Sequence, residues 1–584
     1  MKASRIFVAL FVVFTIVCEA APARAEIKPN FVKDFLQRYR PSAVTFSSSA
    51  AAATSSQQLA DLVRSGQLPL TMGDLINLIL QNNLDVGVNR LSPLSSQYLI
   101  DTLYLQFEPT LHLQATVNRN TTPGVSVLSG AANPSTLSGA YTVGFSQSLS
   151  TGTNVAIDAS MNRSSSNNNF STFNPSWSGS LRYSFTQHLA RDFGRSVNTR
   201  QIRVARNNEK ISEIQFERQM IDLVAQAQRS YWDLVFSADD IKVKQRSVDL
   251  AQKTLSDNQI QVQIGTLAPI DLVQAESEVA NRRVQYVTST YTEIQTQDQV
   301  KKLVTSQGDP GTIMAKLMPV QGVRKPDPSD VLPVDEAIKV ALENRPEMKQ
   351  FQLDLENKNI DLQYTKNQLL PTIDLIGSYT QTGVAGTPIC SPTLPPNTKC
   401  TQAPPSPFGF GSGSGSTVNP DLIGGLGTSF GQLFSYNYSG YSAGFSVQIP
   451  LRNRAAQADN ARAATEKRIA ENRLTAQAQQ IALEVRNALT QVEMNRAKID
   501  AAQTARELAE RRLEAEQKKF DLGASTIRFV LEEQRNLAQA QTDELQSLVN
   551  YTKSLVDFDR AVGMTLKKNN IEMEKTLNFG TTAK

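Results

Sequence analysis

The sequence predicts a mixed α and β membrane protein, in which a transmembrane β-barrel continues into long α-helices and the chain contains two structural repeats. Three observations lead to this prediction. Several short segments alternate apolar and polar residues, two segments of about 70 residues have the composition of long helices, and the same order of motifs occurs twice in the 584 residues. Alternation with a period of two indicates strands, whereas an apolar residue every three or four positions indicates helices.

The first 25 residues are typical of a secretory signal peptide. Lys2 and Arg5 carry positive charge, residues 6–18 are apolar, and Ala23 to Ala25 fit a small-residue cleavage site. An apolar run of this length is too short to span a bilayer, which takes about 20 residues. We expect the mature chain to begin near Glu26.

Two segments are expected to be poorly ordered. Residues 26–69 are rich in Ser and Ala, and residues 566–584 form a polar tail. Neither has enough apolar side chains to compensate the loss of chain entropy on folding. We therefore assign them as a flexible N-terminal segment and a C-terminal tail.

The charge balance argues against a nucleic-acid partner. The chain has 59 Lys and Arg residues against 55 Asp and Glu residues, a net charge of +4, and the signal peptide removes three bases and one acid. A nucleic-acid-binding protein needs a clear basic stripe. The near-neutral mature chain offers none.

Matching motifs occur in the two halves of the chain. Residues 70–76, 108–111 and 183–189 have similar counterparts 262 positions later, and the motif around Gly265 recurs 258 positions later at Gly523. Order and spacing that persist over most of the chain favour internal repeats over chance. The expected organisation is a first repeat at 70–306, a proline-containing linker at 307–331 and a second repeat at 332–565.

Strands are expected at 110–189 in the first repeat and at 372–449 in the second. In residues 441–449, Tyr441, Phe445 and Val447 fall on one face and small or polar residues on the other. This alternation is typical of a barrel with lipid outside and water inside. A soluble β-sandwich would alternate in the same way, but these few strands between very long helices could not form two packed sheets.

Two features of the strand regions depart from a simple pattern. The first half contains an additional hairpin, 141–149 with 153–161, which either enters the barrel or projects from it. The second half contains an unusually long loop at 383–435, rich in glycine, which we expect outside the cell.

Long helical hairpins are expected at 195–306 and 453–563. Their first helices, about 70 residues each without proline, would reach about 105 Å at 1.5 Å per residue. Their apolar residues form narrow stripes, which is typical of coiled coils. Gly265 and Gly523 suit the left-handed position that ends a helix. Pro269 suits the first turn of the returning helix, and Ser525 or Thr526 could cap the other.

Two cysteines, Cys390 and Cys400, follow the signal peptide, and both lie in the long loop of the second half. An even number of closely spaced cysteines in an exported chain suggests a disulfide, which the spacing permits without requiring. A metal pair is disfavoured because neither His112 nor His188 is near them. We expect no metal and no cofactor.

The ordered set of motifs resembles the TolC-like outer-membrane efflux protein family over residues 70–565. The resemblance rests on the duplicated halves, on Glu108-Pro109-Thr110 and Leu370-Pro371-Thr372 before strands, and on residues 270–273 and 530–532 after the tip glycines. It implies a homotrimer whose strands close one shared 12-stranded barrel in outer-membrane lipid, and whose helices form a periplasmic tunnel. The implied function is an exit duct for efflux or type I secretion.

The resemblance also implies partners. They are a periplasmic adaptor, also called a membrane fusion protein, and through it an inner-membrane pump of the RND or ABC type. Gly265 and Gly523, at the tips of the hairpins, are then part of the surface that docks on the adaptor. The cargo is not readable from the sequence, because a duct need not recognise it.

The same resemblance implies a gate just past the tips. Asp271 and Glu532 match carboxylate positions, and three copies of each would make a ring that attracts cations. Phe529 stands at the second gate-carboxylate position, where we expect it to hinder passage by size. Phe520 and Ser525 replace the usual polar link between hairpins, which we expect to be either weakened or rebuilt through Arg528. The alternative for each charge is a solvated helix face.

Three other functions were weighed. An enzyme is disfavoured because only two histidines exist and no nucleophile elbow, phosphate loop or metal-spaced cluster occurs. A periplasmic coiled-coil adaptor or scaffold protein is the main alternative, but such proteins usually carry one helical hairpin. A diffusion porin would lack the long helices.

Overall fold

The structure is a computed structural model that describes Tyr39 and residues 67–125, 131–168, 171–265, 267–304, 314–389 and 419–572. All helices and strands discussed here belong to one compact unit, Ser56–Leu577. Residues 390–418, which include Cys390 and Cys400, lie outside the described residues.

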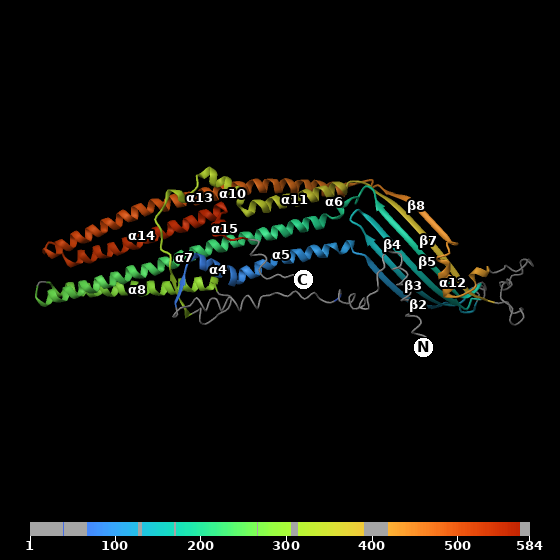
Figure 1. Cartoon of the computed structure of the whole chain (residues 1–584), viewed down its shortest axis with the longest axis horizontal. Coiled ribbons are helices and arrows are strands. Elements are labelled where there is room, and N and C mark those ends of the chain that lie inside the picture. The colour runs from blue at the N-terminus through green and yellow to red at the C-terminus, as the bar shows by residue number, and fades with distance from the viewer. Residues whose placement is uncertain are drawn as a thin grey trace, which may run out of the picture. The chain divides into compact units, whose positions relative to one another are not determined.

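Six antiparallel strands form one continuous sheet in the order β2-β3-β4-β5-β7-β8 (Figure 1). The strands are β2 (Thr110–Thr121), β3 (Ser135–Ser148), β4 (Thr153–Ser166), β5 (Phe173–His188), β7 (Thr372–Pro388) and β8 (Ser439–Gln448). Each alternating segment of the sequence lies in one of these strands, except for the last residue of two segments, Leu149 and Ile449. Most strands are longer than expected, because they continue past the regularly alternating residues.

The sheet has one apolar face and one polar face. Except next to the bulge at Phe173, every register pair joins two residues of the same parity, so that odd-numbered residues share a face. One row across the apolar face consists of Leu111, Phe145, Ile157, Tyr183, Tyr379 and Tyr441. The next row, on the polar face, consists of His112, Gly144, Asp158, Arg182, Thr380 and Gly440.

The additional hairpin of the first half is part of the sheet. β3 pairs with β2 over twelve positions and β4 pairs with β5 over twelve, so the hairpin separates β2 from β5. This answers the question that the sequence left open: the hairpin joins the sheet, and the first half supplies four strands and the second half two.

Two long helical hairpins leave the same end of the sheet (Figure 1). The first consists of α7 (Arg200–Gln263) and α8 (Pro269–Val304), and the second of α13 (Arg454–Asp521) and α14 (Ile527–Val562). With 64 and 68 residues, α7 and α13 are about 96 and 102 Å long. The first hairpin starts later than expected, because α6 (Arg195–Asn198) is a separate short helix.

Shorter helices precede the strands in each half. They are α4 (Met72–Asn82) and α5 (Leu84–Leu103) in the first half and α10 (Val334–Asn344) and α11 (Pro346–Asn367) in the second. Thr71 begins α4 with a capping box, in which its hydroxyl oxygen accepts from the Asp74 N–H at 3.2 Å. α15 (Thr565–Lys568) follows α14. No helix in the described ranges is both long enough and apolar enough to cross a membrane.

Four helices lie side by side at each level of the helical part. Near the sheet, α7 contacts α5 and α11, and α11 contacts α13. Toward the tips, α7 contacts α8 and α14, and α14 contacts α13. Polar side chains connect neighbouring helices of this wall. Arg200 of α7 donates to Asp361 of α11 at 2.8 Å, which joins the two halves, and Lys358 of α11 donates to Glu466 of α13 at 2.8 Å within the second half.

A small parallel sheet lies beside the middle of α7. β1 (Gln67–Leu70) pairs with β6 (Lys316–Pro319), and their apolar side chains share a core with Tyr231 of α7. The Tyr231 hydroxyl donates to the Leu70 carbonyl at 3.2 Å. Two expectations are thereby corrected: the flexible segment 26–69 ends in a strand, and the linker 307–331 contains one. Four-residue strands are too short to show alternation, which is why the pattern missed them.

A short helix in the long loop packs on the apolar face of the sheet. α12 (Leu426–Gln432) lies over the register pair Gly179 and Gly383, and the Ser429 hydroxyl donates to the Gly383 carbonyl at 3.0 Å. A Cβ atom on Gly383 would lie 2.1 Å from the Ser429 carbonyl oxygen. The two glycines therefore allow the helix to approach the strands, and part of the segment expected as an irregular loop is ordered.

Candidate functional site

The hairpin tips are built around two glycines with left-handed backbone. Gly265 has φ of +81° and Gly523 has φ of +74°, as the sequence predicted. The Ala524 N–H donates to the Lys519 carbonyl at 2.8 Å, which closes the end of α13. Pro269 is the first residue of α8, as expected. Thr526 occupies the cap position of α14 without a capping hydrogen bond, and the Ser525 hydroxyl donates to Glu516.

The expected gate residues lie within the first turns of the returning helices. Asp271 is half-buried in the first turn of α8. Arg528, Phe529 and Glu532 are exposed on α14, and the Arg528 guanidinium carbon lies 5.7 Å from the centre of the Phe529 ring. Arg528 thus contacts its neighbour on the same helix. In the part of the chain that the structure describes, no hydrogen bond or ion pair joins Arg528 to the first hairpin.

An apolar cluster and a charged cluster join the hairpins near the tips. The apolar cluster contains Ala275 of α8 with Ile527, Val530 and Leu531 of α14, and Phe520 of α13 packs against it. Phe520 therefore contributes apolar contact at the position where the resemblance led us to look for a polar link. The polar contact lies one to two turns further along α8.

Glu278 and Arg282 of α8 form this polar contact with α14. Arg282 donates to Glu278 at 3.0 Å and, at 3.3 Å, to the Leu531 carbonyl of α14; Arg535 of α14 donates to Glu278 at 2.9 Å. Arg282 also donates to the Ser247 carbonyl of α7 at 3.1 Å. The Glu278 and Arg282 side chains are 9% and 3% exposed, so the pair is almost fully desolvated. We call these three side chains, Glu278, Arg282 and Arg535, the hairpin link.

Burial and pairing act in opposite directions on the hairpin link. Burial by itself raises the pKa of Glu278, but hydrogen bonds and charge from Arg535 and Arg282 outweigh it and lower the pKa below its ordinary value. Burial lowers the pKa of Arg282 from a very high ordinary value. Both groups therefore stay charged at neutral pH, and the carboxylate is the one that acid would neutralise.

The hairpin link was not predicted from the sequence, although a signal was present. Glu278 and Arg282 are four residues apart, which is the spacing of an ion pair on one helix. Such pairs are common on solvated helices, and α13 contains several, such as Lys518 with Glu514. The Glu278–Arg282 pair differs from the exposed pairs of α13 because Arg535 of the other hairpin lies next to it. That proximity depends on the tertiary structure and cannot be read from the spacing along the chain.

A second polar contact joins the hairpins farther from the tips. Asp240 of α7 accepts from Ser289 of α8 at 2.7 Å and from Thr542 of α14 at 3.3 Å. Lys244 of α7 donates to Thr542 at 3.2 Å. The interface between the hairpins is thus held by polar contacts along its length, in addition to the apolar cluster at the tips.

The polar face of the sheet carries charged side chains of both signs. His112 of β2 extends across Gly144 of β3 to Asp158 of β4, with 3.7 Å between the imidazole Nε2 and the carboxylate. A Cβ atom on residue 144 would lie 1.9 Å from the imidazole, so a larger residue there would displace the His112 side chain from this position. At the helical end of the sheet, the His188 Nδ1 lies 2.7 Å from Asp374 of β7.

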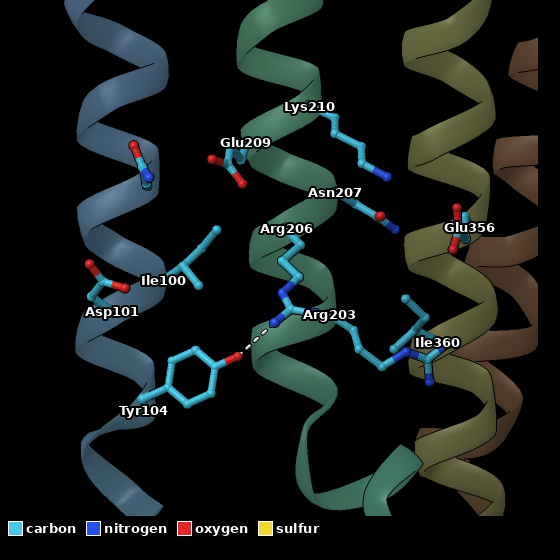
Figure 2. A pocket seen from close by; sticks show the side chains of 11 residues that line it. Ile100, Asp101, Tyr104, Arg203, Arg206, Asn207, Glu209, Lys210, Glu356 and Ile360 are labelled. Carbon is cyan, nitrogen blue, oxygen red and sulfur yellow. Dashed lines mark hydrogen bonds between the residues drawn. The ribbon is translucent and has the colours of Figure 1, made fainter. Parts of the chain in front are cut away.

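A cleft of about 550 Å³ lies between α5, α7 and α11 (Figure 2). Arg206 donates to the Tyr104 hydroxyl at 2.7 Å across it, as the dashed line in Figure 2 shows. Asp101, Glu209 and Glu356 line it together with three bases. A lining of mixed charge does not favour one class of ligand, and no His, Ser or Cys belongs to it. Within the described ranges, no group of three or more metal-ligating residues occurs.

Comparison with known proteins supports the fold and the family. The sequence model of the family described as outer membrane efflux protein matches residues 153–306 and 337–564. No curated protein matches the chain.

Three solved structures illustrate the similarity of fold. A membrane protein from Pseudomonas aeruginosa is 15% identical with a TM-score of 0.57, and the match covers 86% of this chain and 93% of that one. The CmeC outer membrane channel of Campylobacter jejuni is 14% identical with a TM-score of 0.57, covering 88% and 90%. The MtrE outer membrane channel of Neisseria gonorrhoeae, in its open state, is 16% identical with a TM-score of 0.55, covering 85% and 89%.

Proposed function

We propose that this chain, which belongs to the outer membrane efflux protein family, is one of three identical subunits of an exit duct. Its location is the outer membrane, with a helical extension into the periplasm. The family consists of efflux proteins rather than enzymes. The finer parts of the proposal are the trimer, the closed barrel, the two repeats, the gate and the partners.

One observation carries the proposal. A single chain joins a sheet with one apolar and one polar face to helices of about 96 and 102 Å. Lipid can cover the apolar face and water the polar face, if the sheet closes into a barrel. The helices then continue the wall of the barrel into the periplasm, with Gly265 and Gly523 at the far mouth.

Threefold assembly would place the tip residues in rings. Three copies of Asp271 and three of Glu532 would face the axis and attract cations, and three copies of Phe529 would narrow the passage. Arg528 stacks near Phe529 and would hold that ring in place. In the resting duct, the hairpin link would keep the second hairpin close to the first, so that the mouth stays narrow.

The partners follow from an efflux function. A duct has no energy source, so a pump in the inner membrane, of the RND or ABC type, must drive transport. A periplasmic adaptor would bridge the pump to the tips around Gly265 and Gly523. The choice of cargo would belong to the pump, in efflux or in type I secretion.

Electron microscopy and conductance together test the proposal. Protein purified from outer membranes is expected to appear as threefold particles longer than about 100 Å, because the sheet adds to helices of about 96 and 102 Å. The particles are expected to open ion-conducting pores in planar bilayers. Compact monomers that neither conduct nor fractionate with the outer membrane would overturn it, and would favour the periplasmic adaptor or scaffold alternative.

A further inference from the structure

The two edges of the six-stranded sheet lack partners within the described part of the chain. β2 pairs only with β3, and β8 pairs only with β7. In one row of the apolar face, Tyr441 on the edge strand β8 is 89% exposed, whereas Tyr183 on the inner strand β5 is 42% exposed. Long apolar edges of this kind lead to strand pairing with another chain unless they are covered.

The two edges are complementary. Six is an even number, so β2 and β8 run in opposite directions, and β8 of one copy can pair antiparallel with β2 of the next. Their faces also match: Phe445 and Val447 would continue the apolar face into Leu111 and Leu113. A head-to-tail contact between different surfaces forms a closed ring when the rotation between copies permits it.

We propose that each subunit contributes six strands to the wall of the barrel, an inference that rests on the trimeric duct proposed above. Three copies then close an 18-stranded barrel, in which β8 of each copy pairs with β2 of its neighbour. The hairpin β3–β4 is a part of the wall and widens it. At a strand spacing of about 4.8 Å and a tilt of about 40°, 18 strands give a diameter of about 36 Å, against about 24 Å for 12 strands.

The widths of the sheet and of the helical wall support six strands per subunit. At about 6 Å of circumference per strand, the five intervals from β2 to β8 span about 31 Å. The three intervals from α5 to α13, the helices that join those edge strands, span about 24–30 Å at 8–10 Å per interval. Without β3 and β4, the strands would span only about 19 Å. The hairpin brings the barrel to the width of the helices that continue it.

Cysteine pairs on the polar face test the wall within one chain. In a full-length background with Cys390→Ser and Cys400→Ser, oxidation is expected to bridge Thr142→Cys with Ser160→Cys, which are direct register partners. The pair Gln114→Cys with Ser180→Cys is expected not to bridge, because β3 and β4 separate these strands by about 14 Å and a disulfide spans at most about 7 Å between Cα atoms. A bridge between residues 114 and 180 would show that β2 and β5 are neighbours, which would overturn the proposal.

A second set of cysteines tests closure between copies. Ser442→Cys on β8 is combined in turn with a cysteine at each polar-face position of β2, and covalent products are sized on denaturing gels. For at least one position, the largest covalent product is expected to contain three chains. Products that end at two chains would indicate a 12-stranded barrel of two subunits, and no product at any position would show that the edges do not meet; either result overturns the proposal.

Conductance separates this inference from the proposed function. Cross-linked protein is inserted in planar bilayers in parallel. Three-chain products without pores would contradict the duct but leave the strand number standing, whereas pores without three-chain products would contradict the strand number alone.

Discussion

Arg535 of the second hairpin donates a hydrogen bond of 2.9 Å to the Glu278 carboxylate of the first hairpin. Glu278 lies nine residues after the start of α8, so the contact is about 14 Å from that end of the helix. The carboxylate also accepts from Arg282 at 3.0 Å. One buried acidic side chain therefore neutralises two cations from two hairpins, which makes it the member whose removal has the largest effect.

Glu278→Gln is expected to loosen the hairpins near the tips. The substitution leaves Arg282 buried without an opposite charge, and breaking a buried ion pair in this way costs about 3–5 kcal/mol. If the hairpin link keeps the mouth narrow, single-channel conductance in planar bilayers rises. The control is Glu276→Gln, at an exposed position two residues away. Unchanged conductance in a correctly assembled variant would rule out a gating role for the link.

The same carboxylate predicts a dependence on pH. The pKa of Glu278 is lower in the folded chain than in the unfolded chain, so its contribution to stability is fully present above the ordinary value for Glu, about 4.3. It is lost as the pH falls from there through the lowered pKa. Conductance of the wild type is therefore expected to rise below about pH 4 more steeply than that of Glu278→Gln. Parallel pH profiles of the two proteins would contradict this assignment.

Local patterns predicted the elements but not the contacts between them. Period-two alternation identified all six strands of the large sheet, and Gly265 and Gly523 identified the ends of α7 and α13. These features are set by neighbouring residues along the chain. The sequence could not decide whether the β3–β4 hairpin joins the sheet, because an alternating hairpin has the same pattern in either place. That answer depends on register with β2 and β5.

The expected gate shows the same limit. The tip glycines were placed correctly, but the polar contact between hairpins was sought at Arg528, next to the tip. Within the chain, a polar contact between α8 and α14 is formed by Glu278, Arg282 and Arg535, and Phe520 packs against the apolar cluster at the tips. A role of Arg528 in the assembled duct stays a prediction. All four long helices carry many charged side chains, and only the packing of the helices decides which of these side chains are buried.

Glu532→Gln tests the proposed ring of carboxylates. Glu532 is exposed on α14, five residues after the helix begins. Three such charges around a narrow axis attract cations, so the substitution is expected to lower the cation preference measured by reversal potentials in salt gradients. Glu514→Gln, on an exposed position of α13, provides the control. Equal selectivity of all three proteins would assign Glu532 to an ordinary solvated helix face.

Gly383→Ala tests the contact between α12 and the sheet. The added Cβ atom would lie 2.1 Å from the Ser429 carbonyl oxygen, so α12 must move away. Forcing extra atoms into a packed contact usually costs about 1–3 kcal/mol. The variant is expected to dissociate at a lower temperature in detergent, as seen by heat-modified migration on gels. Gly440→Ala is the matched control, because its added Cβ atom meets no atom within 4 Å. A larger loss of stability in the control would contradict the packing argument.

Tyr551 provides a prediction at alkaline pH. Its hydroxyl donates to the Asp330 carboxylate at 3.0 Å, and the side chain lies in the core of α13 and α14. Burial, followed by the hydrogen bond to Asp330 and its charge, raises the pKa of Tyr551 to about 12. Because the folded pKa exceeds the ordinary value of about 10, the contribution to stability is complete below about pH 10 and is lost as the pH rises toward 12.

Tyr551→Phe is therefore expected to have two effects. At neutral pH it removes one hydrogen bond to a charged acceptor, which costs about 1.5–3 kcal/mol in the free energy of unfolding, while Arg324 still pairs with Asp330. Between pH 10 and 12, the difference between wild type and variant should shrink, because the Tyr551 hydroxyl ionises in the unfolded wild type before it ionises in the folded one, and phenylalanine has no such group. Denaturant unfolding of the detergent-solubilised protein at pH 8, 10 and 11.5 measures both effects. The control is Tyr291→Phe, because Tyr291 is 64% exposed. A difference that stays constant with pH would show that the pKa of Tyr551 is the same in the folded and the unfolded chain, which would contradict the raised pKa.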